Sequence, residues 1–258
     1  MRFVRFQKSK ETPKYGWLDG EQVGELTAPP FQEHRRLEAV VDLIKVKLLP
    51  PVLPSKIIGV GRNYSEHARE QGVEIPEYPL LFMKPVTALI GSGAEIVLPP
   101  QSQQVEHEAE LALIIGKVGR WIRPQDASRH ILGYTIANDV TARDLQARDG
   151  QWTRAKGFDT FCPLGPWIET EMDVADRLIT CRVNGGPRQM ASTREMIFPI
   201  AQLIAYISSV MTLLPGDVIL TGTPAGVNSL APGDEVEITI DGLGTLKNLV
   251  RSESRVNS

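Results

Sequence analysis

The chain has 258 residues, of which 42% are hydrophobic and 23% are charged, as in ordinary globular proteins. Its 28 basic and 31 acidic residues give a formal net charge of −3, which gives no reason to expect nucleic acid as a partner. Two cysteines imply no disulfide framework, and no apolar run reaches the roughly 18 residues of a membrane span. The N-terminus alternates charged and apolar residues instead of forming a signal peptide. We therefore expect a cytoplasmic protein without nucleic-acid or membrane partners.

The first part of the chain predicts a small β-rich domain. Residues 2–6 alternate as a strand does, and Asp19-Gly20 is a strong hairpin signal. Residues 37–49 are apolar-rich and fit either a helix or a strand. The proline-rich stretch 50–54 is the best linker candidate. We place a boundary there, between a small N-terminal domain (1–53) and a catalytic domain (54–258).

The main body is typical of short strands with few helices. Strands are predicted at 56–61, 80–84, 105–116, 131–137, from 166 onward, at 178–183, at 218–221 and around Asp241-Gly242 within 234–249. Helices are predicted at 63–71, 124–130, 141–148 and, most clearly, 199–214. The chain has no βαβ rhythm and no glycine-rich phosphate loop, so a nucleotide-binding fold is not expected. The fold class is a mixed, β-rich α+β architecture that is largely antiparallel.

One stretch, residues 105–116, begins with acidic residues at every second position and ends as an apolar run. On a continuous strand, Glu106, Glu108 and Glu110 would share one face. Carboxylates at that spacing repel each other unless water or a cation separates them. Because the strand continues into a core, where solvation is poor, this pattern suggests a metal site.

A second carboxylate source is Asp139, which follows the buried strand 131–137. Together with Glu108 and Glu110 it would form an all-oxygen set of three carboxylates. Mg²⁺ and Mn²⁺ fit such a set better than Zn²⁺, which favours nitrogen and sulfur. For Glu106 two interpretations stay open, a solvated surface residue or a residue that supports the ligands from behind.

Six motifs in this order resemble the fumarylacetoacetate hydrolase superfamily, in its form with a short N-terminal domain, from about residue 56 to residue 250. They are Gly59-Val60-Gly61-Arg62-Asn63-Tyr64-Ser65-Glu66-His67, Pro79-Leu80-Leu81-Phe82-Met83-Lys84-Pro85, Glu106-His107-Glu108-Ala109-Glu110-Leu111, Asn138-Asp139-Val140-Thr141-Ala142-Arg143-Asp144, Lys156-Gly157-Phe158-Asp159-Thr160 and Gly216-Asp217-Val218-Ile219-Leu220-Thr221-Gly222-Thr223-Pro224. The resemblance implies a mixed β-roll, a homodimer, and a divalent metal held by carboxylates. It also implies substrates that are 2-oxo or enol acids, often dicarboxylates.

Carried over to this sequence, the resemblance makes Glu108, Glu110 and Asp139 the metal ligands, the same trio that the spacing indicates. His67 and Glu70, three residues apart on a helix, are the implied catalytic pair, in which Glu70 orients and charges His67. Residues 62–78 are implied to be a lid that orders over bound substrate.

The remaining implied site residues are spread over the main body. Lys156 is implied to stabilise an oxyanion or enolate near the metal. Gln146 and Thr223 match positions that contact the substrate, and Arg62 could pair with a substrate carboxylate through its fork. We interpret Arg143 and Asp144 as structural, paired with each other or across an interface, and His107 as a packed or surface residue.

These residues predict an enzyme that acts on 2-oxo or enol (di)carboxylic acids through an enolate beside a bound Mg²⁺ or Mn²⁺. A His67–Glu70 pair equipped to activate water favours C–C cleavage, as acylpyruvate-type hydrolysis or β-keto acid decarboxylation. The alternative is an isomerase or tautomerase of 2-hydroxy-dienedioates such as 2-hydroxyhepta-2,4-diene-1,7-dioate in aromatic catabolism. A remote alternative is a non-catalytic protein with a structural Ca²⁺ site.

Overall fold

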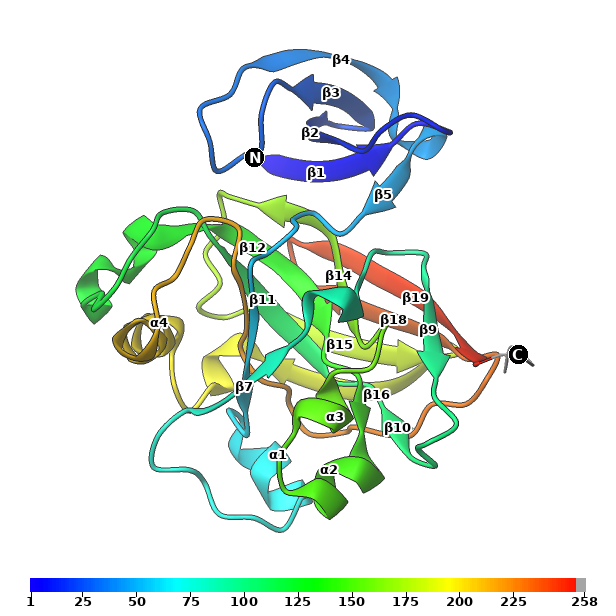
Figure 1. Cartoon of the computed structure of the whole chain (residues 1–258), viewed down its shortest axis with the longest axis vertical. Helices are drawn as coiled ribbons and strands as arrows, with labels where there is room; N and C mark the ends of the chain where they lie inside the picture. The colour runs from blue at the N-terminus through cyan, green and yellow to red at the C-terminus, as the bar shows by residue number, and fades with distance from the viewer. Residues whose placement is uncertain (254–258) are drawn as a thin grey trace.

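The computed structural model describes residues 1–253, which form a β-rich fold with short helices (Figure 1). The strands of the largest sheet are β1 (Arg2–Gln7), β2 (Lys14–Asp19), β3 (Gln22–Leu26), β4 (Arg36–Asp42), β5 (Lys47–Leu49), β6 (Ile57–Gly61), β7 (Leu80–Lys84), β8 (Leu89–Ile90), β11 (Ala109–Ile115), β12 (Ile131–Asn138), β14 (Cys162–Glu169) and β17 (Val218–Leu220). A 5-stranded sheet contains β9 (Glu95–Leu98), β15 (Leu178–Val183), β16 (Gly186–Ser192), β18 (Glu235–Ile240) and β19 (Gly244–Ser252). A third, 2-stranded sheet pairs β10 (Val105–Glu106) with β13 (Thr141–Ala142). The predicted β-rich class is confirmed.

In the described part of the chain, four α-helices accompany the sheets, together with short 3₁₀ helices. They are α1 (Ser65–Glu70), α2 (Arg143–Asp149), α3 (Thr153–Lys156) and α4 (Ile200–Val210). Figure 1 shows α1, α2 and α3 together at the end of the main body that lies farthest from the N-terminal strands. Within residues 1–253, no helix is long and apolar enough to span a membrane.

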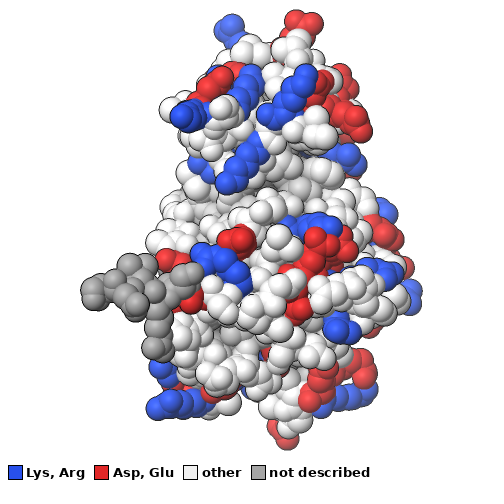
Figure 2. Space-filling view, turned by 90° about the vertical axis from the view of Figure 1, so that its right-hand side faces the viewer, with Lys and Arg blue, Asp and Glu red and all other residues white. Residues whose placement is uncertain are grey.

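The N-terminal strands extend the large sheet, whose order is β4-β3-β2-β1-β14-β12-β11-β17-β6-β7. Strand β1 pairs with β14, and the N-terminal amine lies 2.7 Å from the Glu169 carboxylate at the end of β14. The ambiguous stretch 37–49 is extended, because β4 and β5 occupy most of it. Figure 2 shows this unit as a lobe above the main body, with charges of both signs interspersed on that face. The boundary at residue 53 falls between β5 and β6 and stays a prediction.

The acidic stretch is not the single strand that its alternation predicts. It divides into β10 and β11, with a break at His107-Glu108. At and just after the break, side chains accept two of the backbone N–H groups: Asn138 accepts from Glu108, and Gln189 accepts from Ala109, the first residue of β11. A one-face alternation from residue 106 to residue 110 is therefore wrong, although β11 itself follows the predicted course.

The other predicted helices and strands are present in the structure, and they differ from the prediction mainly at their ends. Helix α4 ends at Val210, four residues before the predicted end, because Met211 is already extended. The segment 124–130 is a 3₁₀ helix, and 141–148 begins with the short strand β13 before α2 starts. Strand β14 begins at Cys162, before the predicted start at 166.

Strand β11 is buried along its whole length, and both its faces contact hydrophobic core. Leu113 and Ile115 pack in the cluster that includes Ile207 of α4, whereas Ala112 and Ile114 pack in the cluster on the opposite face. The β11–β12 register places Ala109 opposite Asn138, and Asp139 donates its N–H to the carbonyl of Glu108 at 2.9 Å. The acidic end of β11 and the end of β12 therefore meet at one edge of the core.

Gly59 in β6 provides a test of the packing near this edge. A Cβ at residue 59 would lie 2.1 Å from the Phe82 ring, which is closer than real contacts allow. We expect Gly59→Ala to lower the free energy of unfolding by about 2 kcal/mol, because an overfilled core forces its neighbours to move. Urea unfolding followed by circular dichroism measures the change. The double variant Gly59→Ala/Phe82→Leu should recover part of the loss, and a single variant as stable as the parent protein would contradict this packing.

Candidate active site

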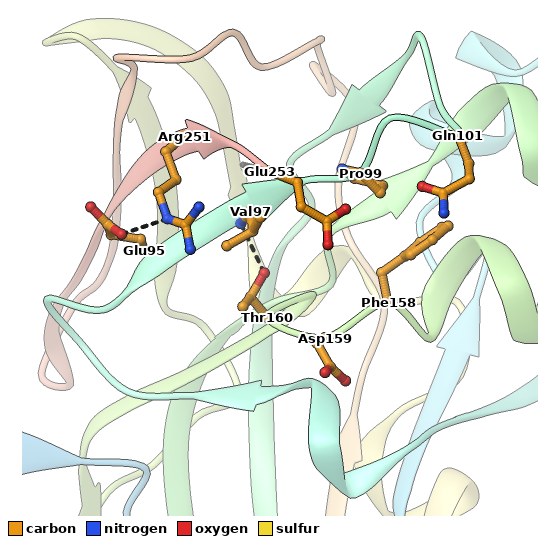
Figure 3. A pocket seen from close by; sticks show the side chains of 9 residues that line it. All are labelled: Glu95, Val97, Pro99, Gln101, Phe158, Asp159, Thr160, Arg251 and Glu253. Atoms are coloured by element: carbon orange, nitrogen blue, oxygen red, sulfur yellow. Dashed lines mark hydrogen bonds and ion pairs between the residues drawn. The ribbon is translucent and has the colours of Figure 1, made fainter. Parts of the chain in front are cut away.

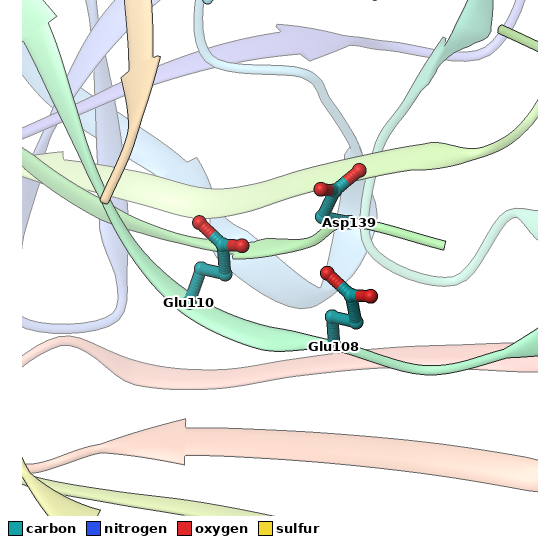
Figure 4. A group of neighbouring side chains, drawn as sticks. All are labelled: Glu108, Glu110 and Asp139. Atoms are coloured by element: carbon teal, nitrogen blue, oxygen red, sulfur yellow. The ribbon is translucent and has the colours of Figure 1, made fainter. Parts of the chain in front are cut away.

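Three predicted carboxylates converge at the end of β11, where their carboxyl groups point into the same region (Figure 4). Glu108 precedes β11, Glu110 lies within it, and Asp139 follows β12. All three are buried, and one oxygen atom from each lies within 4.8 Å of the others. The chain thus places three acidic groups in a space where their charges must be balanced.

Two buried lysines supply part of that balance. Lys156, the last residue of α3, donates to Glu108 Oε2 at 2.9 Å and to Asp139 Oδ2 at 2.5 Å. Lys84, the last residue of β7, donates to Asp139 Oδ1 at 2.5 Å and to the carbonyl of Val140. Burial alone would lower the pKa of Lys156, but the negative charges of Asp139 and Glu108 outweigh it and hold that pKa above its ordinary value. Lys156 is therefore a charged donor.

The two glutamates have opposite electrostatic environments. Burial tends to raise the pKa of Glu108, but the charges of Lys156 and Arg143 outweigh burial and hold that pKa well below its ordinary range. Burial raises the pKa of Glu110 well above its ordinary value, and the neighbouring Asp139 and Glu108 add to the rise. Among residues 1–253, Glu110 has no cationic side chain in ion-pair contact, and its Oε2 accepts only the N–H of Gly222, at 2.7 Å.

This arrangement fits a hard divalent cation. All three converging groups offer oxygen atoms, which are the ligands that Mg²⁺ and Mn²⁺ prefer. A cation would also supply the positive charge that Glu110 lacks, and so reverse the rise in its pKa. The donor chemistry and the charge deficit thus agree with the predicted metal site.

The predicted His67–Glu70 pair is formed on α1. Nδ1 of His67 lies 3.1 Å from Glu70 Oε2, and the other oxygen of Glu70 accepts the N–H of Gly226 at 2.9 Å. Nε2 of His67 lies 2.9 Å from the side-chain amide of Gln71. His67 is buried, and both of its ring nitrogens have a side-chain partner on α1 or at its end.

A pocket of 430 Å³ lies beside Arg143, whose guanidinium is bonded to Glu108, and several predicted residues line it. Arg62, Glu70 and Gln146 line it, together with Trp152 and Arg143. Arg62 has φ +58°, a strained conformation for a long side chain. The pocket therefore brings predicted binding residues and one member of the His67–Glu70 pair to a common wall.

Thr223 lies in the same region, but its hydroxyl is already engaged. Its Oγ1 donates to the carbonyl of Ala109 at 2.9 Å and accepts from Gln189 at 2.7 Å. Contact with a substrate carboxylate would require this hydroxyl to turn. Its role in substrate binding stays a prediction.

Glu106 and His107 also have defined places. Glu106 is buried and accepts from Arg143 Nε at 2.8 Å, so the interpretation as a solvated residue is wrong. It supports Glu108 from behind through the shared guanidinium of Arg143. His107 is fully buried, which lowers its pKa, and it packs against Gln189 as the packed alternative predicts.

Sequence reasoning missed several residues that bond to the carboxylate cluster or its backbone, among them Thr141, whose hydroxyl donates to Glu108 Oε1 at 3.1 Å. Arg143 is bonded to both Glu106 and Glu108, and not to Asp144, whose carboxylate accepts from residues 102 and 103. Lys84 ends the apolar strand β7 within one of the six motifs, and a lysine at that position could have indicated a buried cation near the site. Asn138 joins the break in the acidic stretch to β12, and nothing in the linear pattern indicates this contact.

A larger cavity lies elsewhere (Figure 3). It measures 810 Å³ and lies between β9, β19 and residues 158–160. Its walls are tied by an ion pair between Arg251 and Glu95 at 2.7 Å and by Thr160, which accepts the N–H of Val97. None of the predicted site residues lines it, so size alone does not identify the active site.

Comparison with known families agrees with this geometry. A family model described as fumarylacetoacetate (FAA) hydrolase C-terminal matches residues 56–251, and one described as Rv2993c-like, N-terminal matches residues 1–51. The chain belongs to the fumarylacetoacetate hydrolase family. Its predicted resemblance is thereby confirmed.

Individual relatives carry several reaction names. The chain is 47% identical to the oxaloacetate tautomerase FAHD2A, mitochondrial, of Homo sapiens over 79% of this chain and 68% of the relative. It is 44% identical to the structure of a 2-hydroxyhepta-2,4-diene-1,7-dioate isomerase from Mycobacterium marinum, with a TM-score of 0.91 over 99% and 100% of the two chains. It is 32% identical to maleylpyruvate hydrolase from Sphingobium sp. SYK-6 in complex with manganese (II) ion and pyruvate, with a TM-score of 0.81 over 98% and 100%. The family thus assigns an enzyme without choosing among these reactions.

Asp139 is paired with two lysines, whereas the pKa of Glu110 is raised. Neutralising these two carboxylates should therefore change the free energy of unfolding in opposite directions. Asp139→Asn leaves the buried ammonium groups of Lys84 and Lys156 without their shared anion. In the metal-free protein we expect the free energy of unfolding to fall by about 3 kcal/mol, the cost of breaking a buried pair on one side. Urea unfolding in EDTA at pH 8 measures the loss.

Glu110→Gln is the matched control. A carboxyl whose pKa is higher in the folded than in the unfolded state binds its proton more tightly when folded. Stability therefore falls as pH rises from the usual carboxyl range toward the raised pKa. The glutamine removes this fall, so Glu110→Gln should be at least as stable as the parent protein at pH 8. Equal losses in the two variants would contradict the charge assignment.

Proposed function

We propose that the protein is a divalent-metal-dependent enzyme that acts on 2-oxo or enol (di)carboxylic acids. The observation that carries the proposal is the buried trio Glu108, Glu110 and Asp139, with the Lys156 ammonium bonded to two of its members. A site built only to hold a structural ion would not need a buried cation between its ligands.

Glu108, Glu110 and Asp139 would hold the cation, which we propose to be Mg²⁺ or Mn²⁺. When bound, it supplies Lewis-acid polarisation of the substrate's 2-oxo group. The manganese (II) and pyruvate named for the Sphingobium hydrolase support this ligand class.

Lys156 would stabilise the negative charge that develops when a bond beside the 2-oxo group breaks. Its ammonium is buried and positively charged, so it acts in a medium of low polarity where a fixed donor is worth more than in water. Its bonds to Glu108 and Asp139 fix its position before substrate arrives.

His67 would hold or move the proton, with Glu70 as its orienting partner. The 3.1 Å contact between Nδ1 and Glu70 leaves Nε2 to act on a substrate proton or on a water molecule once Gln71 gives way. Arg62, Gln146 and Thr223 are the proposed substrate-binding residues. Arg62 and Gln146 are supported by their place in the pocket wall.

For the reaction itself we propose C–C cleavage, as acylpyruvate-type hydrolysis or β-keto acid decarboxylation, because the His67–Glu70 pair is suited to activating water. Tautomerisation or isomerisation is the second candidate, favoured by the names of the human and Mycobacterium marinum relatives. An absorbance screen of acylpyruvates, the enol of oxaloacetate and 2-hydroxy-dienedioates with Mg²⁺ distinguishes the two. Loss of the acyl chromophore with release of pyruvate supports cleavage, whereas a spectral shift without a C3 product supports tautomerisation.

We also propose that the protein is a homodimer, as the family resemblance implies. Light scattering after size exclusion gives the mass directly, and a monomer across the micromolar range would refute this part of the proposal.

The metal proposal predicts a selective stabilisation. Mn²⁺ or Mg²⁺ together with oxalate, an enolate mimic, should raise the melting temperature by several degrees, and Ca²⁺ should raise it less. Glu108→Ala should abolish both the shift and turnover, because it removes one proposed ligand and one of the two carboxylates that hold Lys156. Differential scanning fluorimetry gives the shift. Turnover by Glu108→Ala in the presence of a chelator would overturn the proposal.

If His67 transfers a proton and does not bind the metal, its replacement should lower kcat without weakening metal binding. His67→Gln should lower kcat by 10²-fold or more, about the contribution of general acid–base catalysis, while Mn²⁺ affinity changes little. Steady-state kinetics and Mn²⁺ titration calorimetry measure the two. Ser65→Ala, at the start of the same helix, is the control and should retain both values. A His67→Gln variant with unchanged kcat would remove His67 from the mechanism.

A further inference from the structure

Gln189, in strand β16 of the 5-stranded sheet, joins two parts of the site that are far apart in sequence. Its side chain is 1% exposed, and all four hydrogen-bonding positions of its amide are used. Oε1 accepts the N–H of Ala109 at 3.0 Å and lies 3.0 Å from His107 Nδ1. Nε2 donates to Thr223 Oγ1 and to the carbonyl of Pro224, both at 2.7 Å. One amide group thus contacts four residues, two next to the carboxylates and two in the loop that follows β17.

The Oε1 half of this amide fixes the start of the ligand strand. Ala109, between Glu108 and Glu110, is the first residue of β11; β12 pairs with it on one side, whereas β17 on the other side pairs only with residues 112–114. On that unpaired side the amide oxygen of Gln189 accepts the N–H of Ala109. The two glutamates on either side therefore take their direction from a residue of the other sheet.

The Nε2 half fixes a loop, Gly222–Gly226, that reaches both the ligand strand and α1. At one end of the loop, the N–H of Gly222 donates to Glu110 Oε2 at 2.7 Å. At the other end, the N–H of Gly226 donates to Glu70 Oε1 at 2.9 Å. The loop lies directly against β16, since a Cβ at Gly226 would come within 2.2 Å of the Arg188 carbonyl.

We propose that Gln189 is a positioning residue that holds the ligand strand and the anchor of the His67–Glu70 pair in one fixed arrangement. It does so through Ala109 on one side and through Pro224 and Gly226 on the other. Gln189 does not touch the carboxylates or His67 in the hydrogen bonds of the structure, so its effect passes through the backbone. The expected effect on kcat rests on the proposed function, whereas the expected effect on the backbone does not.

Two substitutions separate the halves of the amide. Gln189→Met has a similar shape and neither donates nor accepts strongly, so it should release both the strand and the loop. Gln189→Glu keeps the acceptor oxygen for Ala109 and loses the donor to Thr223 and Pro224, so it should release mainly the loop. Arg188→Gln, an exposed neighbour on the same strand, is the control.

Amide hydrogen exchange read by mass spectrometry tests the structural part without any substrate. In Gln189→Met, exchange should accelerate by about tenfold both in residues 107–111 and in residues 65–70, the effect expected for one lost buried hydrogen bond. In Gln189→Glu it should accelerate in 65–70 and stay near the parent value in 107–111. Arg188→Gln should match the parent protein in both segments.

Mn²⁺ titration and kinetics test the functional part. Gln189→Met should bind Mn²⁺ about tenfold more weakly and lose kcat, whereas Gln189→Glu should keep Mn²⁺ affinity within about twofold and lose kcat. Uniformly faster exchange along the chain, with no difference between the variants, would reduce Gln189 to an ordinary core residue and overturn the proposal. If the parent protein turns over none of the tested acids, the proposed function fails, while the exchange pattern and the Mn²⁺ titration still decide the role of Gln189.

Discussion

The structure depends on a group of opposite charges buried at one end of β11. Glu108, Glu110 and Asp139 face the cations Lys84 and Lys156 in surroundings that exclude water. Attraction between such charges is strong in a medium of low polarity, but each ion also loses its hydration, so the group is stable only if every member has a partner. Glu110 is the member without a cation, and the raised pKa of its carboxyl records that imbalance. The same imbalance is what a divalent ion would correct.

This charge group also explains how the chain is arranged around it. Lys84 ends β7, Arg143 begins α2 and Lys156 ends α3, so three elements are each tied to the carboxylates by a terminal residue. The ends of elements are where a side chain can turn away from the packing of its own strand or helix. The apolar parts of β11 and α4 provide the rigid core behind them. Charge is thus concentrated at one edge while hydrophobic burial holds the edge in place.

The sequence was sufficient for the trio but not for its partners. Alternation identified Glu108 and Glu110, and the end of a buried strand identified Asp139, because both signals are local. Lys84 lies 55 residues from Asp139, and Gln189 lies 80 residues from Ala109, so those contacts exist only once the sheets have formed. The small N-terminal unit and most strands were predictable for the same reason as the trio: they depend on alternation and on turns such as Asp19-Gly20. Helix ends were less so, because tertiary contacts decide where a helix stops.

The break at His107-Glu108 shows where local periodicity fails to predict the structure. On a regular strand, Glu106, Glu108 and Glu110 would lie in a row on one face. Instead, Arg143 bonds both residues, and Glu106 is held back as a support while Glu108 stays with Glu110 and Asp139. The two residues outside the strands still have hydrogen-bond partners: Asn138 accepts the N–H of Glu108, the Glu108 carbonyl accepts the N–H of Asp139, and the N–H of His107 donates to the carbonyl of Asn228. The irregularity therefore keeps its backbone hydrogen bonds, and it converts an evenly spaced row of charges into a buried carboxylate cluster with its own counter-ion.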